Sequence, residues 1–123
     1  MSLKRSIVAV DDSRIVLQSL EGILGDRYDF RGFSKVERAL SYLEQFPPSL
    51  IILDIDMPEV NGYEMMEMIR EREELRNIPI LFLTSNNERD NVLKAAAYGV
   101  DDYAVKPIEK EILINKIEAL LPE

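Results

Sequence analysis

The sequence predicts an α/β domain, in which a five-stranded parallel sheet carries helices on both faces. Short apolar runs alternate with segments of helical period along the whole 123-residue chain. Three of the five apolar runs are nearly continuous in Ile, Val, Leu and Phe, as expected for parallel strands that are covered on both faces. A chain of this length has room for one domain, so we expect residues 1–123 to form it without a separate output domain.

The strand candidates are five short apolar segments. In chain order they are Ser6–Val10, Asp29–Phe33, Leu50–Leu53, Ile80–Leu83 and Tyr103–Val105. Short connections between five strand–helix repeats favour an open parallel sheet with helices on both sides. For this size we expect the flavodoxin-like strand order 2-1-3-4-5, which is taken from folds of that type rather than worked out from the residues.

The first two expected helices follow the first two strands. The first presents an apolar stripe of Val16, Leu20, Ile23 and Leu24. Gly25 is placed to end that helix. The second begins at a predicted capping box, in which the side chains of Ser34 and Glu37 would bond the backbone of the first turn. Its inward residues are Val36, Leu40 and Leu43.

Three more helices complete the pattern. The third begins near Asn61–Gly62, because the residues after this pair have helical rather than alternating period. The fourth covers residues 88–98 and ends at Gly99. The fifth buries a stripe of Leu113, Ile117 and Leu120.

Composition excludes several classes of site. The chain has no cysteine, which excludes disulfides and thiolate metal sites, and no histidine, which excludes imidazole-based catalysis. A net charge of −8 argues against nucleic-acid binding and against an anionic membrane surface. The N-terminal apolar run is too short for a signal peptide, and no stretch has the length of a membrane span. We therefore expect a soluble cytoplasmic protein.

Polar residues stand at the carboxyl ends of four predicted strands, where open parallel sheets bind their ligands. The first strand ends at Asp11–Asp12, the third at Asp54, the fourth at Thr84–Ser85, and Lys106–Pro107 follows the fifth. Carboxylates around one point bind a hard divalent cation, and a carboxylate can act as a nucleophile toward phosphorus. A lysine and a hydroxyl would stabilise phosphoryl oxygens. Together these groups indicate phosphoryl transfer.

Each of these residues also has a structural interpretation. Asp12 or Ser13 could simply cap the first helix, Thr84 could be structural, and Lys106 could be a solvated surface charge. Their joint placement at one edge of the sheet is what favours a functional site.

The sequence resembles response-regulator receiver domains over essentially its whole length. The matching segments are Val8–Ser13, Leu53–Pro58 with Asn61–Gly62, Leu83–Ser85 and Gly99–Pro107. The resemblance implies two-component signalling, in which Asp54 is the phosphoacceptor. It further implies that Mg²⁺ (Mn²⁺ is an alternative) is held by Asp11, Asp12, Asp54 and the backbone carbonyl of Asp56.

The resemblance also assigns the neighbouring residues. Thr84 and Lys106 would contact the phosphoryl group, and Tyr103 would be the aromatic switch residue that turns inward when Thr84 is drawn to the phosphate. The Lys106–Pro107 peptide bond would be cis. Asp56 and Asn86 occupy positions that tune the phosphoryl lifetime.

We expect the Asp56 side chain to point toward the phosphoryl group if the strand stays extended. A like charge there would hinder hydroxide, whereas a base would orient water; we expect the first effect to dominate. A solvent-facing side chain is the remaining alternative.

The implied partners are a sensor histidine kinase or a histidine phosphotransfer protein. Ile15 and Ile108 are the expected docking residues, while Val16 is at least as well explained as core. The face of the fourth helix, fifth strand and fifth helix could form a homodimer or effector contact, through Ile114 and Leu121, which we expect to lie off the buried stripe.

The domain is expected to catalyse only its own phosphorylation and dephosphorylation. The alternative is an aspartate-nucleophile phosphatase of the haloacid-dehalogenase type. Those enzymes place an acidic pair after their lysine, whereas Asp101–Asp102 precedes Lys106 here.

Overall fold

The computed structural model describes residues 4–85, 97 and 99–121. Its sheet has the order β2-β1-β3-β4-β5 with every neighbouring pair parallel, which confirms the predicted fold class and strand order. The strands are β1 (Ser6–Val10), β2 (Asp29–Phe33), β3 (Leu50–Asp54), β4 (Ile80–Thr84) and β5 (Asp102–Val105). Asp54 and Thr84 are therefore the last residues of their strands rather than the residues that follow them.

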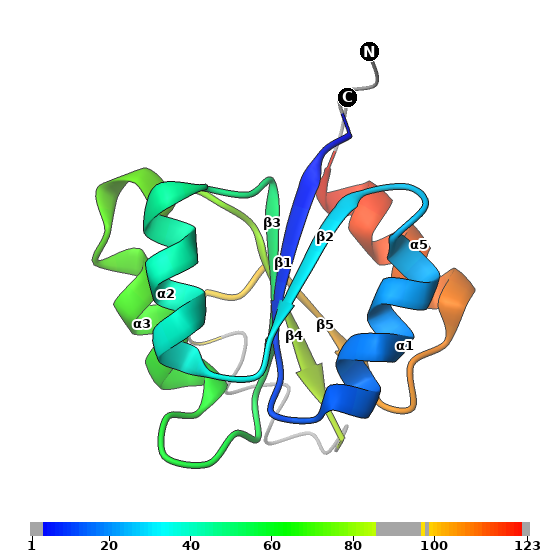
Figure 1. Cartoon of the computed structure of the whole chain (residues 1–123), viewed down its shortest axis with the longest axis horizontal. Helices are drawn as coiled ribbons and strands as arrows, with labels where there is room; N and C mark the ends of the chain where they lie inside the picture. Colours follow the sequence, from blue (N-terminus) through cyan, green and yellow to red (C-terminus); the bar gives the residue numbers. More distant parts are fainter. Residues whose placement is uncertain (1–3, 86–96, 98, 122–123) are drawn as a thin grey trace.

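Helices cover both faces of the sheet (Figure 1). On one face lie α1 (Arg14–Leu24) and α5 (Lys110–Leu120); on the other lie α2 (Val36–Gln45), α3 (Gly62–Arg70) and the short 3₁₀ turn η1 (Glu73–Leu75). The helix predicted over residues 88–98 lies outside the described residues except for residue 97. Gly99, its expected end, has a φ of 79°, a conformation that glycine adopts without strain.

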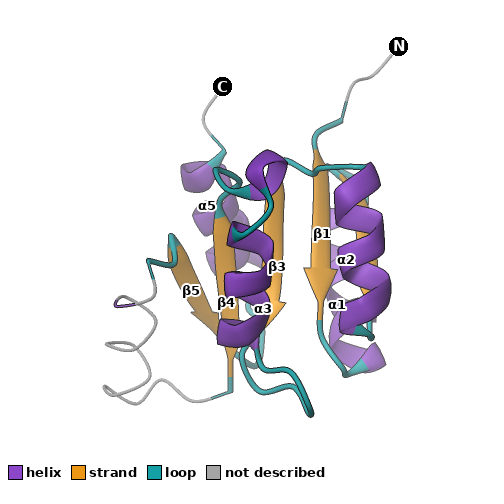
Figure 2. Ribbon diagram, turned by 90° about the vertical axis from the view of Figure 1, so that its left-hand side faces the viewer, coloured by secondary structure: helices purple, strands orange, loops and turns teal. Residues whose placement is uncertain are grey.

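The core consists of two apolar layers, one on each side of the sheet. Successive strand side chains point to opposite faces, so Val8 and Val10 pack on the α2–α3 side while Ile7 and Ala9 pack on the α1–α5 side. Every residue of β3 and β4 is buried, as their continuous apolar sequences predict. These two buried strands carry Asp54 and Thr84 at their carboxyl ends. The labelled arrows of β1, β3, β4 and β5 point the same way in Figure 2, and β2 is parallel to β1, so these ends share one edge of the sheet.

Side chains cap two helices. The Ser13 hydroxyl accepts a hydrogen bond from Val16 N at 3.3 Å, which confirms the capping alternative for that serine. Asn61 and Glu64 form a capping box at the start of α3. The capping box predicted at Ser34 is wrong: α2 begins at Val36, its N-cap is Lys35, and no side chain caps it. Ser34 therefore lies one residue before the position from which a hydroxyl can cap.

The prediction for Ile114 is also wrong. Ile114 is 7% exposed and packs in the α1–α5 layer with Leu113 and Ile117, and Leu121 packs against the same layer. Ile112, which is 49% exposed, is instead the outward apolar residue of α5. None of the described helices combines the length and apolar character that crossing a membrane requires.

Candidate functional site

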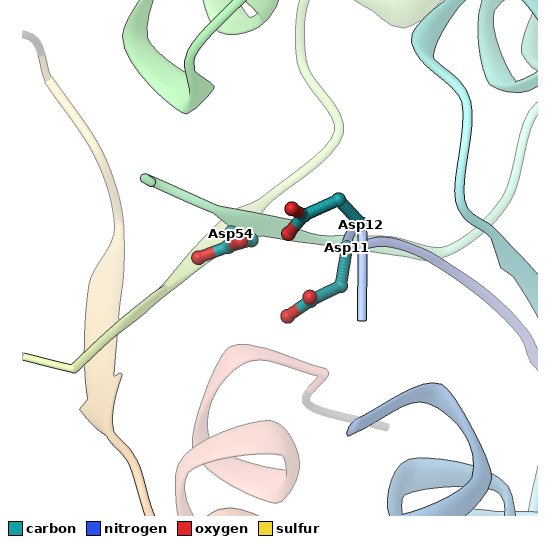
Figure 3. A group of neighbouring side chains, drawn as sticks. All are labelled: Asp11, Asp12 and Asp54. Carbon is teal, nitrogen blue, oxygen red and sulfur yellow. The ribbon is translucent and has the colours of Figure 1, made fainter. Parts of the chain in front are cut away.

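Three carboxylates meet at the carboxyl edge of the sheet (Figure 3). Asp11 and Asp12 follow β1, and Asp54 ends the neighbouring strand β3. Each offers an oxygen within 4.8 Å of the others. Asp11 and Asp54 are 0% and 1% exposed, whereas Asp12 is exposed. The predicted convergence of these residues is therefore present, with two carboxylates buried and the third at the solvent boundary.

Lys106 brings a positive charge to this cluster. Its Nζ lies 3.0 Å from Asp11 Oδ2 and 3.2 Å from Asp54 Oδ1. Its backbone N–H donates to Thr84 O at 2.7 Å, which ties the loop after β5 to the end of β4. The Lys106–Pro107 peptide bond is cis, as the family resemblance implies. The sequence-predicted lysine thus lies against both buried carboxylates.

The electrostatics of the site follow from burial and from crowded charge. Burial and then the neighbouring charge of Asp11 raise the pKa of Asp54 from 3.8 to about 6, although Lys106 and the Asp56 N–H act in the opposite direction. Burial alone would lower the pKa of Lys106, but its contacts with Asp11 and Asp54 outweigh that effect and raise it. The site therefore disfavours the charge on Asp54, and a further positive charge there would relieve this cost.

The two oxygens of Asp11 have different surroundings. Oδ1 accepts a hydrogen bond from Ser13 N at 2.9 Å. Oδ2 is buried and has no hydrogen-bond donor in the described part of the chain, because its contact with Lys106 has the distance of an ion pair without hydrogen-bond geometry. The Lys106 ammonium offsets part of the cost of burying this oxygen, which has no other nearby donor among the described residues. An under-satisfied buried oxygen, beside two more carboxylates, fits a hard divalent cation that takes oxygen ligands.

The expected switch residues lie on neighbouring strands. Thr84 ends β4 and is buried. Tyr103 is half-buried and stands opposite Phe82, two residues before Thr84, so Tyr103 and Thr84 share a face of the sheet. Lys116 Nζ lies 5.4 Å from the centroid of the Tyr103 ring. A pocket of about 360 Å³ adjoins Tyr103 and is also lined by Ile108, Ile112 and Lys116.

Asp56 is exposed, but its backbone and its side chain each form a hydrogen bond. Its backbone N–H donates to Asp54 Oδ1 at 3.2 Å. Its carboxylate Oδ2 accepts a hydrogen bond from the Ser85 hydroxyl at 3.3 Å. From the sequence, Ser85 was expected only as part of the polar end of the fourth strand, and its contact with Asp56 was not predicted. Asn86, the second predicted lifetime residue, lies outside the described residues.

Gly62 fits where the loop after β3 returns against the site. Its N–H donates to Ile55 O at 3.0 Å. A Cβ at this position would lie 2.6 Å from Asp54 O and 2.9 Å from Ile55 Cα. The glycine of the Asn61–Gly62 pair is therefore required by close backbone approach to the strand that carries Asp54.

The predicted docking residues differ in exposure. Ile15, on α1 beside the site, is 76% exposed. Ile108 and Val16 are half-buried and pack against the α1–α5 layer, which supports the core interpretation of Val16.

Comparisons with known proteins agree on one family. The family model described as Response regulator receiver domain matches residues 7–118. Two-component response regulator ORR11 of Oryza sativa subsp. indica is 31% identical over 118 residues, which cover 94% of this chain and 80% of that protein. Sensory transduction protein BceR of Halalkalibacterium halodurans is 29% identical over 94% of this chain. The chain spans only about half of that relative, 49% of its length.

Solved structures give the same result. Chemotaxis protein CheY4 of Vibrio cholerae superposes with a TM-score of 0.91 at 27% identity, covering 97% of this chain and 100% of that one. The alternative of a haloacid-dehalogenase-type phosphatase has no support among these comparisons.

Proposed function

Because the chain belongs to the response regulator receiver domains, which are phosphoryl-accepting signalling domains, we propose that it accepts a phosphoryl group on Asp54. The donor would be a phosphohistidine of a sensor histidine kinase or a histidine phosphotransfer protein. The observation that carries this proposal is the placement of Asp54, which is buried at a strand end beside Asp11, Asp12 and the Lys106 ammonium.

The proposed reaction is a direct transfer. A carboxylate oxygen of Asp54 bonds to phosphorus, the bond between phosphorus and the donor nitrogen breaks, and an acyl phosphate results. Lys106 would place its charge on a phosphoryl oxygen, and the Thr84 hydroxyl would donate to another. These two residues already lie together, since Lys106 N bonds to Thr84 O.

Mg²⁺, or Mn²⁺ in its place, is the proposed cofactor. The carboxylates of Asp11, Asp12 and Asp54 and the backbone carbonyl of Asp56 would hold it. The under-satisfied Oδ2 of Asp11 supports this assignment. When bound, the cation offsets the negative charge of the phosphoryl group and of the carboxylates. Asp12→Ala should therefore weaken Mg²⁺ binding strongly, as measured by calorimetric titration, whereas unchanged affinity would refute this ligand set.

Two further parts of the proposal concern the response. Phosphorylation adds about −1.5 to −2 charges at the site. Thr84 and Tyr103 would pass this change to the face of β5 and α5, where the pocket beside Tyr103 offers an effector or homodimer contact. The fourth helix, which we expect to take part, lies outside the described residues. Asp56 and Asn86 would set the lifetime of the acyl phosphate. The charge of Asp56 lies at the rim of the site, and Asp56→Asn should accelerate hydrolysis several-fold.

We also propose that donors dock beside the exposed Ile15, with Ile108 at the margin of the same surface. A kinase or phosphotransfer protein would thereby reach the open rim of the site. Ile15→Glu and Ile108→Glu should slow transfer from a phosphohistidine donor but not from a small acyl phosphate, and unchanged kinase transfer would place docking elsewhere.

The test of the function is stoichiometric phosphorylation. The protein is incubated with acetyl phosphate, with Mg²⁺ or with a chelator, and its intact mass is measured. We expect one added phosphoryl group that needs Mg²⁺, disappears in Asp54→Asn and persists in Asp101→Asn, an aspartate at the opposite edge of the sheet. Equal labelling of Asp54→Asn would overturn the proposal. Sustained turnover of a generic phosphomonoester would favour an enzyme, whereas the proposed domain catalyses only its own phosphorylation and dephosphorylation.

A further inference from the structure

One hydrogen bond at the rim of the site joins two loops that are far apart in the sequence. Ser85 Oγ lies 3.3 Å from Asp56 Oδ2, and Asp56 is the exposed residue two positions after Asp54. Within the described residues, no other side-chain bond to the Asp56 carboxylate is present. Among the described side chains, the Ser85 hydroxyl is therefore the one that holds this carboxylate.

The backbone around Ser85 is well anchored. Ile55 N donates to Leu83 O at 2.9 Å, and Lys106 N donates to Thr84 O at 2.7 Å, so the end of β4 is tied to the loops on both sides. Ser85 follows directly and projects from this fixed point. A hydroxyl held in this way can restrain a side chain on the neighbouring loop.

The Asp56 carboxylate matters because of where Asp54 lies. Asp54 is 1% exposed, and the exposed residues Asp12 and Asp56 lie next to it at the rim of the site. The Asp56 backbone is also close, with its N–H 3.2 Å from Asp54 Oδ1. A negative charge fixed at this rim repels hydroxide, and a charge that swings into solvent is screened and acts weakly.

We propose that Ser85 is a positioning residue, which holds the Asp56 carboxylate at the rim and thereby lengthens the lifetime of an acyl phosphate on Asp54. In the reaction that it slows, the oxygen of a hydroxide ion bonds to phosphorus and the bond from phosphorus to the Asp54 oxygen breaks. Hydrogen phosphate leaves with the hydroxide proton, and the Asp54 carboxylate is restored. This inference rests on the proposed function of Asp54.

The kinetic test is a double-mutant cycle. The phosphorylated protein is separated from its donor, and loss of the phosphoryl group is followed by intact mass for wild type, Ser85→Ala, Asp56→Ala and the double variant. Ser85→Ala should accelerate hydrolysis about two- to threefold. The same change should have no effect in the Asp56→Ala background, because there is no carboxylate left to position. Ser85→Thr, which keeps the hydroxyl, should restore the wild-type lifetime.

Ser41→Ala provides a matched control, since it removes an exposed hydroxyl from α2 and should leave the lifetime unchanged. Equal acceleration in both Asp56 backgrounds would overturn the inference, because Ser85 would then act without Asp56. An unchanged or longer lifetime in Ser85→Ala would overturn it as well.

A second readout needs no phosphorylation. Three-bond NMR couplings in the unphosphorylated protein report the χ1 rotamer of Asp56. We expect one dominant rotamer in wild type and averaging over rotamers in Ser85→Ala. A wild-type Asp56 that is already averaged would overturn the inference, whatever the outcome for Asp54. If Asp54 of the wild type formed no acyl phosphate, the proposed function would be refuted. That failure would be seen by intact mass and would be distinct from the outcome of the NMR measurement.

Discussion

Charged groups have opposite surroundings at the two edges of the sheet, namely the amino edge, where the parallel strands begin, and the carboxyl edge, where they end. At the amino edge, Asp101 accepts a hydrogen bond from Ile80 N at 2.8 Å and lies 3.7 Å from Arg70 Nη2. Arg70 in turn donates to the carbonyls of Arg76 and Ile78 at 2.7 and 2.8 Å. Each of these contacts joins opposite charges or a donor to an acceptor. These contacts therefore stabilise the amino edge.

At the carboxyl edge, like charges are crowded together. Asp11 and Asp54 are buried beside each other, the pKa of Asp54 is raised to about 6, and Asp11 Oδ2 has no hydrogen-bond donor among the described residues. Lys106 offsets part of this repulsion. The difference indicates that the fold gives up stability at the edge where a cation and a phosphoryl group would bind, and keeps it at the other edge.

The largest expected effect is at the close approach behind Asp54. Gly62→Ala would place a Cβ 2.6 Å from Asp54 O, and the backbone of β3 cannot yield without disturbing the site. We expect a loss of about 3 kcal/mol in the free energy of unfolding, measured in urea. Gly22→Ala is the matched control: its Cβ would meet nothing within 4 Å in the exposed last turn of α1, and it should stabilise by roughly 0.5–1 kcal/mol. Equal effects of the two changes would contradict the geometry.

The next effect tests whether the charge of Asp54 at the carboxyl edge lowers or raises the free energy of unfolding. Since the pKa of Asp54 is raised from 3.8 to about 6, the unfolded chain releases this proton before the folded one does. The resulting cost is absent below about pH 4, grows to about pH 6 and is constant above it. In the presence of a chelator, Asp54→Asn should therefore raise the free energy of unfolding by about 2 kcal/mol at neutral pH.

Urea unfolding across this pH range measures the effect. The advantage of Asp54→Asn should shrink as pH falls from about 6 to about 4. A variant that is less stable than wild type at neutral pH would show that Asp54 contributes stability, and the contrast between the two edges would fail.

The smallest effect is expected at the amino edge, with the opposite sign. Asp101→Ala removes the acceptor of Ile80 N and the ion-pair partner of Arg70. We expect a loss of about 1 kcal/mol at neutral pH, because the Ile80 N–H is left without this side-chain acceptor. Thermal unfolding monitored by circular dichroism suffices as the measurement. Stabilisation by this change would remove the distinction between the edges.

Much of the site could be predicted because it depends on strand ends. In parallel strands, residues that terminate different strands must meet at one edge, so Asp11, Asp54, Thr84 and Lys106 could be brought together before any coordinates were known. The site was predicted from these polar residues because each of them stands at the end of an apolar strand segment. The apolar continuity of β3 and β4 predicted that both faces of these strands are covered, as they are.

The errors have local physical causes. A helix start shifted by a single residue moved Ser34 out of capping position, and such a shift leaves the apolar pattern unchanged. Ile114 is buried because α5 packs a stripe wide enough to include both Leu113 and Ile114. The bond between Ser85 and Asp56 joins residues 29 positions apart through their side chains, and no periodicity records such a contact.

The most direct test of the account is chemical mapping of the phosphorylated residue. After phosphorylation with Mg²⁺, borohydride reduces an acyl phosphate on an aspartate to homoserine, and peptide sequencing by mass spectrometry locates the change. We expect homoserine at position 54, with Asp11, Asp12 and Asp56 left as aspartate. Homoserine at any of those three positions, with Asp54 unmodified, would contradict it.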